Sequence, residues 1–230
     1  MGITESTGAR QFYMKYRHLI FDFDGVLAES NEIRFTGFRL LFQDYPVKTV
    51  DRFMQYVRSN GGISRYEKIK YFFESIYPDA PISDAKMTEL AMRYSALVKR
   101  AVIEAPLVKG AMEFLSQHAT GYDFAIVSGS DQEELREICR TRGIDRFFVE
   151  ILGSPADKES NLSFLLSRTG WDRESCLFIG DSLNDFEAAQ LNKIAFMGRD
   201  SGLVHWEQLG DVAAIHDLTE LPVYLGQLSV

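Results

Sequence analysis

The sequence lacks long apolar runs and has few cysteines. No apolar stretch approaches the ~20 residues that a membrane-spanning helix needs, and residues 1–17 have no apolar centre of the signal-peptide kind. The two cysteines, Cys139 and Cys176, lie on apolar periodic stretches, which favours buried, reduced thiols over a disulfide or a metal site. We therefore expect a cytoplasmic protein with no membrane partner.

Basic residues are fewer than acidic residues. The chain has 25 Lys and Arg against 33 Asp and Glu, a net charge of −8, which argues against a nucleic-acid partner. Its 230 residues, 46% of them hydrophobic, suffice for one large domain or for a core with a smaller module. We expect residues 1–15 to be flexible and the protein to be a monomer or a homodimer.

The sequence does contain short apolar segments that alternate with helical ones. Runs rich in β-branched and aromatic residues predict strands, the first leading into Asp22 and the others at 123–127, 147–152, 176–179, 194–197 and 212–215. Helical periodicity fills the segments between the later strands. This alternation is typical of βαβ units, so we predict a Rossmann-like, three-layer α/β core with a mostly parallel sheet.

Residues 30–104 interrupt the alternation after its first strand and carry helical signals only. Ser64 with Glu67 forms a capping box, and Ser83 caps a later helix. We predict an inserted all-helical domain over 30–104, with the core formed by residues 16–29 and 105–230. A further capping box is predicted at Ser130 and Glu133, so that Ser130 is expected only to cap a helix.

The segment Phe21-Asp22-Phe23-Asp24-Gly25 places two acids at the end of the first strand. Like charges this close raise each other's pKa, so a positive group is needed between them. A hard divalent cation with oxygen ligands is the obvious candidate. Taken alone, Asp22 and Asp24 fit equally well as solvated residues of a turn that Gly25 closes.

Three further polar clusters decide between these interpretations. Each follows a predicted strand: Ser128-Gly129-Ser130, then Lys158, then Gly180-Asp181-Ser182-Leu183-Asn184-Asp185. Ligands of open α/β sheets bind at the carboxyl ends of the strands. We therefore expect the four clusters to meet in one site.

Together, these motifs resemble those of the haloacid dehalogenase-like superfamily of phosphatases. The helical insertion is similar to the C1-type cap of its phosphoglycolate phosphatase and β-phosphoglucomutase branch. The resemblance covers nearly the whole chain from about residue 16, but Glu159 follows Lys158 where the family frequently has proline. It implies a Mg²⁺-dependent phosphatase that acts on a small phosphorylated metabolite, either a sugar phosphate or a phosphoglycolate-like compound.

The resemblance also assigns roles that chemistry supports. Asp22 would be the nucleophile that forms an aspartyl-phosphate, and Asp24 would act as general acid and then as general base. Lys158 would neutralise the crowded negative charge. Ser128 and the amide of Gly129 would hold phosphoryl oxygens.

The expected Mg²⁺ ligands are acidic. Asp22, the backbone carbonyl of Asp24, Asp181 and Asp185 would supply the oxygen atoms. Without a cation, this concentration of carboxylates would repel a phosphate dianion, so metal dependence is close to a physical requirement.

Basic residues in the insertion are candidates for substrate contact. Arg65 and Lys68 lie in the first turn of a helix, where cations oppose the helix dipole and a bound anion would relieve the mismatch. We expect Arg65 to contact a substrate carboxylate, hydroxyl or phosphate, the alternative being a solvent-facing side chain. Arg34 lies near the position where mutase relatives are expected to carry a histidine. For Arg34, a substrate contact and a solvent-facing side chain both remain open.

Other functions remain as alternatives. A β-phosphoglucomutase-like mutase would use the same covalent chemistry, and a non-catalytic module would only bind a phosphometabolite. A dehalogenase and a phosphonate hydrolase are disfavoured because both are expected to lack an acid at the position of Asp24.

Overall fold

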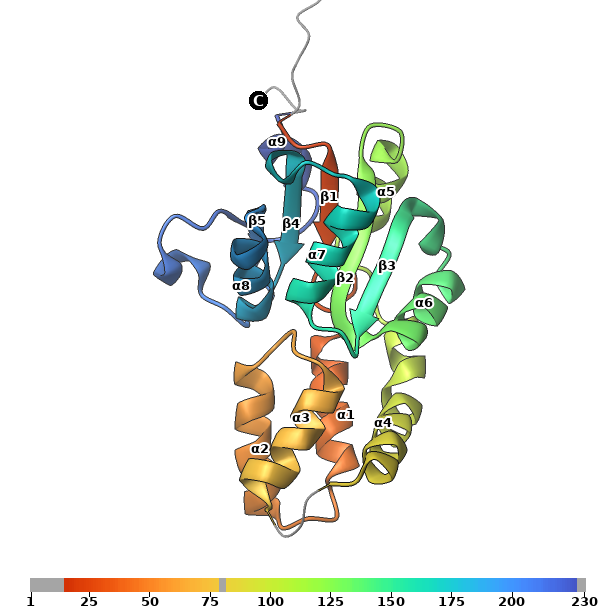
Figure 1. Cartoon of the computed structure of the whole chain (residues 1–230), viewed down its shortest axis with the longest axis vertical. Helices are drawn as coiled ribbons and strands as arrows, with labels where there is room; N and C mark the ends of the chain where they lie inside the picture. Colours follow the sequence, from red (N-terminus) through yellow and green to blue (C-terminus); the bar gives the residue numbers. More distant parts are fainter. Residues whose placement is uncertain (1–14, 79–81, 227–230) are drawn as a thin grey trace, which may run out of the picture.

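The structure, a computed structural model, describes residues 15–78 and 82–226. The predicted flexible segment 1–15 therefore lies, except for Lys15, outside the described residues. Within the described residues, six parallel strands form one sheet in the order β3-β2-β1-β4-β5-β6 (Figure 1). The strands are β1 (His18–Phe21), β2 (Asp123–Asp131), β3 (Phe148–Ser154), β4 (Cys176–Gly180), β5 (Ala195–Arg199) and β6 (Ala214–Ile215).

Helices cover both faces of this sheet. On one face, Ile20 of β1 packs in a cluster with α7 (Lys158–Thr169) and α8 (Leu183–Asn192). On the other face, Phe21 packs in a cluster with α5 (Ala111–His118) and α6 (Gln132–Thr141). Successive residues of a strand point to opposite faces, so β1 serves both layers. The remaining short helices are η2 (Asp145–Phe147), η3 (Arg173–Ser175), η4 (Trp206–Leu209) and α9 (Leu221–Tyr224). The predicted three-layer α/β fold is confirmed.

Strand β1 lies in the middle of the sheet. Its residues pair with β2 on one side and β4 on the other, with His18 opposite both Asp123 and Cys176. The amide of Asp22 continues the ladder by donating to the carbonyl of Ile179 at 2.9 Å. The carboxyl end of β1, where the two acids follow, is therefore held from both sides.

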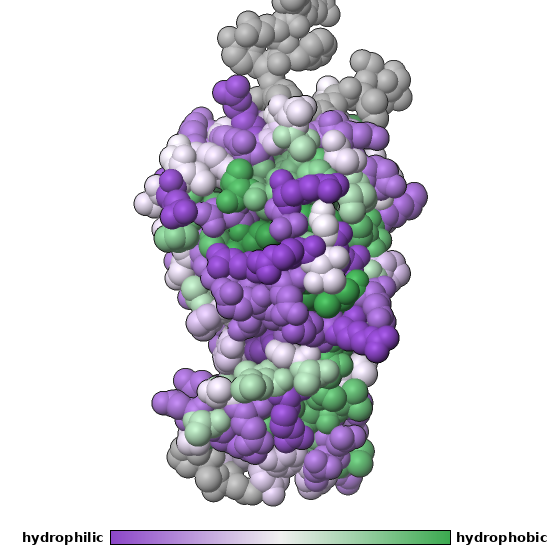
Figure 2. Space-filling view, turned by 90° about the vertical axis from the view of Figure 1, so that its right-hand side faces the viewer, coloured by the Kyte–Doolittle hydropathy of each residue, from purple (hydrophilic) through white to green (hydrophobic). Residues whose placement is uncertain are grey.

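A helical insert follows β1. Its elements are α1 (Asn31–Leu41), α2 (Val47–Ser59), α3 (Arg65–Tyr71), the π-helical turn η1 (Phe72–Ile76) and α4 (Asp84–Glu104). Figure 1 shows this insert beyond the carboxyl ends of the strands, and Figure 2 shows a narrowing between it and the rest of the molecule. Aromatic rings fill its interior, among them Phe38, Phe42, Phe53, Phe72 and Tyr94.

The predicted helix starts at Ser64 and Ser83 are confirmed, although the Glu67 carboxylate accepts from the Ser64 hydroxyl and not from its amide, so the predicted capping box is only half formed. The Ser64 hydroxyl accepts from the amide of Glu67 at 3.2 Å, and the Ser83 hydroxyl accepts from the amide of Lys86 at 3.2 Å. Each contact satisfies an otherwise unpaired amide of the first helical turn.

The two ends of the insert lie side by side. Ala28 and Leu107 form an antiparallel bridge. On either side of it, the Glu29 amide donates to the Pro106 carbonyl at 2.9 Å and the Val108 amide to the Leu27 carbonyl at 3.0 Å. The chain thus leaves the sheet and returns to it at one place.

The capping box predicted at Ser130 is wrong. Strand β2 continues to Asp131, and the Asp131 carboxylate caps α6 by accepting from the amide of Glu134 at 3.0 Å. The strand extends this far because Asp131 still pairs with Ser154 of β3. The Ser130 side chain points instead toward Asp24, as described below.

Candidate active site

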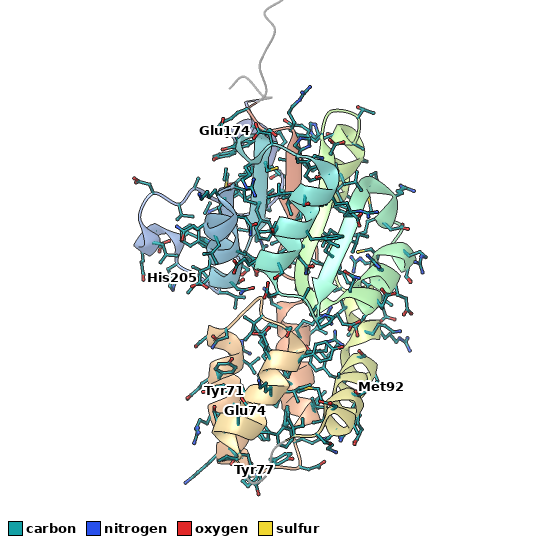
Figure 3. All side chains as sticks on the ribbon, viewed as in Figure 1. Tyr71, Glu74, Tyr77, Met92, Glu174 and His205 are labelled. Atoms are coloured by element: carbon teal, nitrogen blue, oxygen red, sulfur yellow. The ribbon has the colours of Figure 1, made fainter. Side chains whose placement is uncertain are left out.

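The four predicted clusters meet at the carboxyl edge of the sheet. A cavity of about 50 Å³ lies between this edge and the insert, and its lining includes Asp22, Asp24, Ser128, Gly129 and Asp181. Figure 3 shows side chains of both parts filling the space where the insert faces the strand ends. The residues come from separate strands, and the parallel sheet brings them together.

Lys158 lies between two carboxylates. Its Nζ is 3.0 Å from Asp22 Oδ2 and also donates to Asp185 Oδ1. It is the first residue of α7, and Asp157 caps that helix by accepting from the amide of Ser160 at 2.7 Å. Burial alone would lower the pKa of Lys158, but the charges of Asp185 and Asp22 raise it above its ordinary value. The buried ammonium therefore stays charged at neutral pH.

Asp22, Asp181 and Asp185 form a buried group of acids. One carboxylate oxygen from each lies within 4.8 Å of the others. Burial, followed by the charges of neighbouring acids, raises the pKa of Asp22 well above its ordinary value. Burial and the charge of Asp185 likewise raise the pKa of Asp181 to about 7. Three carboxylates thus face the single ammonium of Lys158.

This group fits a divalent cation. The buried Oδ1 of Asp22 has no hydrogen-bond partner among the described residues, and an unpaired buried polar atom is costly. Asp181 is held by Asn31, whose side-chain amide donates to Oδ2 at 2.6 Å. Asp185 is held by Ser182, whose amide and hydroxyl donate to Oδ2 at 3.1 and 2.6 Å. The oxygen donors and the excess negative charge are those that Mg²⁺ prefers.

The Asp24 carboxylate points away from this group. It accepts from the Ser30 hydroxyl at 2.6 Å, the Ser130 hydroxyl at 2.6 Å and Arg34 Nε at 2.9 Å. Burial would raise the pKa of Asp24, but the charge of Arg34 and the two hydroxyls hold it below its ordinary value. Any contribution of Asp24 to a metal site would therefore have to come from its backbone carbonyl, which is the ligand that the family resemblance implies.

Arg34 and Arg65 share one acid that the sequence analysis missed. Glu134 of α6 accepts from Arg34 Nη1 at 2.7 Å and from Arg65 through two hydrogen bonds of 2.9 and 2.7 Å. All three residues are buried, so the solvent-facing alternative for Arg34 and Arg65 is wrong. Burial would raise the pKa of Glu134, but the two guanidinium groups lower it to about 2. In the sequence, Glu134 is merely an acid in a first helical turn.

Two glycines let the insert touch the strand ends. A Cβ on Gly129 would lie 2.0 Å from the carbonyl oxygen of Gly62. A Cβ on Gly62, whose φ is +78°, would lie 2.3 Å from Ser182 Oγ and 3.1 Å from Lys158 Nζ. The contact between the two backbones leaves no room for side chains at these positions.

Comparison with known proteins identifies the family. Residues 19–198 match the family described as haloacid dehalogenase-like hydrolase. The chain belongs to this family. A phosphoglycolate phosphatase of Aliivibrio fischeri is 27% identical over 203 residues, which cover 84% of this chain and 88% of that protein. A 5'-nucleotidase of Pseudomonas aeruginosa is 23% identical over 234 residues, covering 92% and 99%.

Two solved structures share the fold of this chain. CbbY from Rhodobacter sphaeroides, solved with phosphate, superposes with a TM-score of 0.71 at 16% identity and covers 90% of this chain and 96% of its own. YfnB from Bacillus subtilis, solved with magnesium, superposes with a TM-score of 0.65 at 20% identity, covering 92% and 99%.

Several predictions made from the sequence of this haloacid dehalogenase-like hydrolase are thus confirmed. They include the superfamily, the α/β fold with a helical insert after the first strand, and an enzyme of the phosphatase type. Within residues 15–78 and 82–226, no helix is long and apolar enough to cross a membrane. The roles of individual site residues and the domain boundaries stay predictions.

Proposed function

We propose that this hydrolase is a Mg²⁺-dependent phosphomonoesterase that acts on a small phosphorylated metabolite through an aspartyl-phosphate. The observation that carries the proposal is the environment of Asp22. Its buried carboxylate faces the cavity, with one oxygen 3.0 Å from Lys158 Nζ and the other without a hydrogen-bond partner among the described residues. Relatives named phosphoglycolate phosphatase support a substrate of the phosphoglycolate or sugar phosphate type.

In the first step, an oxygen of Asp22 attacks phosphorus and the ester P–O bond breaks. Lys158 offsets the negative charge that gathers on Asp22 and the phosphoryl group. Ser128 and Gly129 lie in the carboxyl-terminal half of β2, and the Ser128 hydroxyl and the Gly129 amide hold the phosphoryl oxygens. Only the protonated form of Asp24 can act in this step: it gives its proton to the leaving alkoxide, which departs as an alcohol. Because the pKa of Asp24 is held below its ordinary value, this form is the minor one in the free enzyme at neutral pH.

In the second step, water attacks the phosphorylated Asp22. Asp24 removes a proton from this water, and the products are inorganic phosphate and free Asp22. The contacts of Asp24 suit this step, because Ser30, Ser130 and Arg34 stabilise its ionised form. An ionised carboxylate accepts the proton of the water.

The residues that would hold Mg²⁺ are Asp22, Asp181, Asp185 and the backbone carbonyl of Asp24. When bound, the cation would screen the carboxylates from the phosphate dianion. The pairing of Asp185 with Lys158 and Ser182 fixes the position of that ligand.

We propose further that the insert, residues 30–104, acts as a cap over the core formed by 16–29 and 105–230. Arg34, Arg65 and Lys68 of the insert line the same cavity as Asp22 and Asp24, so the insert is positioned to close over the site. Closure of this kind excludes bulk water from the reaction. It also favours small metabolites over phosphoproteins and polynucleotides.

The test is phosphate release from a panel of small phosphomonoesters, with Mg²⁺ or with EDTA. The panel includes phosphoglycolate, sugar phosphates and nucleoside monophosphates. We expect metal-dependent release by the wild type and by Asp51→Asn, a control at an exposed residue that pairs with Arg39. Asp22→Asn should release none. Acid-quenched wild type should carry one phosphoryl group on Asp22 by mass spectrometry.

Other results would favour the alternatives. Isomerisation of a sugar 1-phosphate without phosphate release would indicate a mutase. Binding of phosphate esters without either reaction would indicate a non-catalytic module.

A further inference from the structure

The insert side of the cavity contains three buried cations. Arg34, Arg65 and Lys68 line it, and each is at most 7% exposed. Two acids accompany them, the partly buried Asp24 and the buried Glu134. A buried charge is costly unless it is paired. One positive charge is thus in excess on this side, whereas the sheet side has an excess of negative charge.

The excess charge belongs to Lys68. Arg65 makes two hydrogen bonds to Glu134, and Arg34 bonds to both Asp24 and Glu134. The Nζ of Lys68 makes no hydrogen bond or ion pair with any described residue. It lies 5.6 Å from the centre of the Phe38 ring, and the residue is only 6% exposed.

Electrostatics of Lys68 agree with the missing partner. Burial, together with the nearby charge of Lys158, lowers the pKa of Lys68 to about 8. The side chain is therefore still largely protonated at neutral pH. A second buried donor lines the same cavity, because Arg34 Nη2 has no hydrogen-bond partner within the described part of the chain.

The position of Lys68 indicates which part of a substrate it meets. Attacking and leaving oxygens lie roughly in line in phosphoryl transfer. With Asp22 attacking from the end of β1, the leaving alcohol faces the insert. Phosphoryl oxygens are left to Lys158, Ser128 and Gly129 on the sheet side.

We infer that Lys68 determines specificity by binding an anionic group on the alcohol part of the substrate. Arg34 and Arg65 are already paired with Glu134, so Lys68 is the cation that remains for such a group. A single uncompensated cation matches a carboxylate better than a second phosphate dianion. The inference rests on the proposed phosphatase function and refines it: the preferred substrate is a small phosphomonoester whose alcohol carries a carboxylate.

The test compares two esters that differ in one group. Phosphoglycolate carries a carboxylate where 2-hydroxyethyl phosphate carries a neutral hydroxymethyl group, and ethylene glycol bisphosphate supplies a second phosphate. The variants are Lys68→Met, which removes the charge at similar length, and Lys70→Met as the matched control. Lys70 lies on the same helix, but its side chain is 61% exposed and 3.8 Å from Glu74, which Figure 3 labels.

We expect the wild type to prefer phosphoglycolate. Lys68→Met should raise KM for phosphoglycolate roughly tenfold to hundredfold, the loss of one charge-assisted contact. Its kcat, its KM for 2-hydroxyethyl phosphate and its inhibition by inorganic phosphate should change less than threefold. Lys70→Met should behave as the wild type with every ester.

The outcomes separate this inference from the proposed function. Equal losses on both esters, with weaker inhibition by phosphate, would place Lys68 at the phosphoryl group and overturn the inference. A wild-type preference for the bisphosphate would overturn the choice of a carboxylate. Absence of phosphate release from all three esters would overturn the inference if another ester of the panel releases phosphate, and would count against the proposed function if none does. In that case, calorimetry would still test Lys68: the Kd of phosphoglycolate for Asp22→Asn should rise at least tenfold when Lys68→Met is added.

Discussion

The guanidinium of Arg65 and the carboxylate of Glu134 join the helical insert to α6 through two hydrogen bonds, of 2.9 and 2.7 Å. Both side chains are at least 95% buried. Glu134→Gln would leave Arg34 and Arg65 without their shared acid. Unpairing buried charges costs about 3–5 kcal/mol, and we expect a loss of this size in the free energy of unfolding, measured by urea denaturation.

The control for this prediction is Glu137→Gln on the same helix. Glu137 also reaches the insert, through Lys99 at 2.9 Å, but both side chains are at least 37% exposed. Exposed pairs contribute about 0–1 kcal/mol. Similar losses in the two variants would contradict the importance that we assign to burial of Glu134.

The stabilisation of the protein by Mg²⁺ should increase with pH. The folded pKa of Asp181 is raised to about 7. Protonated Asp181 therefore stabilises the metal-free fold. This contribution is fully present below pH 3.8, the ordinary pKa of the group, and is lost as pH rises through 7. Metal ligands must be deprotonated, so Mg²⁺ should stabilise the protein more at pH 8 than at pH 5. At saturation we expect Tm to rise by roughly 5–10 °C at pH 8.

Differential scanning fluorimetry with Mg²⁺ or EDTA checks this expectation. Asp181→Asn should abolish the difference, whereas Asn at the exposed Asp211 should preserve it. Equal Mg²⁺ effects at pH 5 and pH 8, or an unchanged effect in Asp181→Asn, would contradict the proposed metal site.

The hydroxyls of Ser30 and Ser130 should lower the pKa of Asp24. Each donates to one oxygen of the Asp24 carboxylate at 2.6 Å and so favours its ionised form. Removing either hydroxyl, in Ser30→Ala or Ser130→Ala, should raise the pKa of Asp24, because its ionised form loses a hydrogen-bond donor. If ionisation of Asp24 controls part of the pH dependence of kcat/KM, that part of the profile should then move to higher pH. A profile that stays unchanged in both variants would argue against a role of Asp24 in proton transfer.

Gly62 should be intolerant of a side chain. A Cβ there would lie 2.3 Å from Ser182 Oγ, and its φ of +78° disfavours other residues. We expect Gly62→Ala to destabilise the closed arrangement by about 1–2 kcal/mol and to lower kcat/KM about tenfold or more. The matched control is Gly61→Ala, whose Cβ would lie 3.3 Å from a flexible Leu203 methyl group at ordinary φ. Equal activity of the two variants would show that the backbone contact is dispensable.

Local patterns were sufficient to predict most of the fold. The alternation of apolar runs and helical repeats depends on near neighbours in the chain, and the helix starts at Ser64 and Ser83 were found in this way. The meeting of Asp22, Lys158 and Asp181 could be predicted because a parallel sheet places all its carboxyl ends at one edge.

Long-range pairing explains what the sequence did not reveal. The extension of β2 through Ser130 depends on pairing with β3, and the hydroxyl of Ser130 then meets an acid 106 positions away. Glu134 lies 100 and 69 positions from its partners Arg34 and Arg65. No local signal distinguishes such an acid from any other in a first helical turn. The electrostatics of the insert side therefore required the tertiary structure.

The antiparallel bridge between Ala28 and Leu107 has a consequence for how this family can diversify. Because the insert leaves and re-enters at a single hydrogen-bonded junction, its length and helix count are independent of the sheet's geometry. An ancestral chain could exchange one set of helices for another at this junction and keep the carboxylates in register. New substrates could thus be acquired by replacing a module, while the machinery that cleaves the ester is inherited intact.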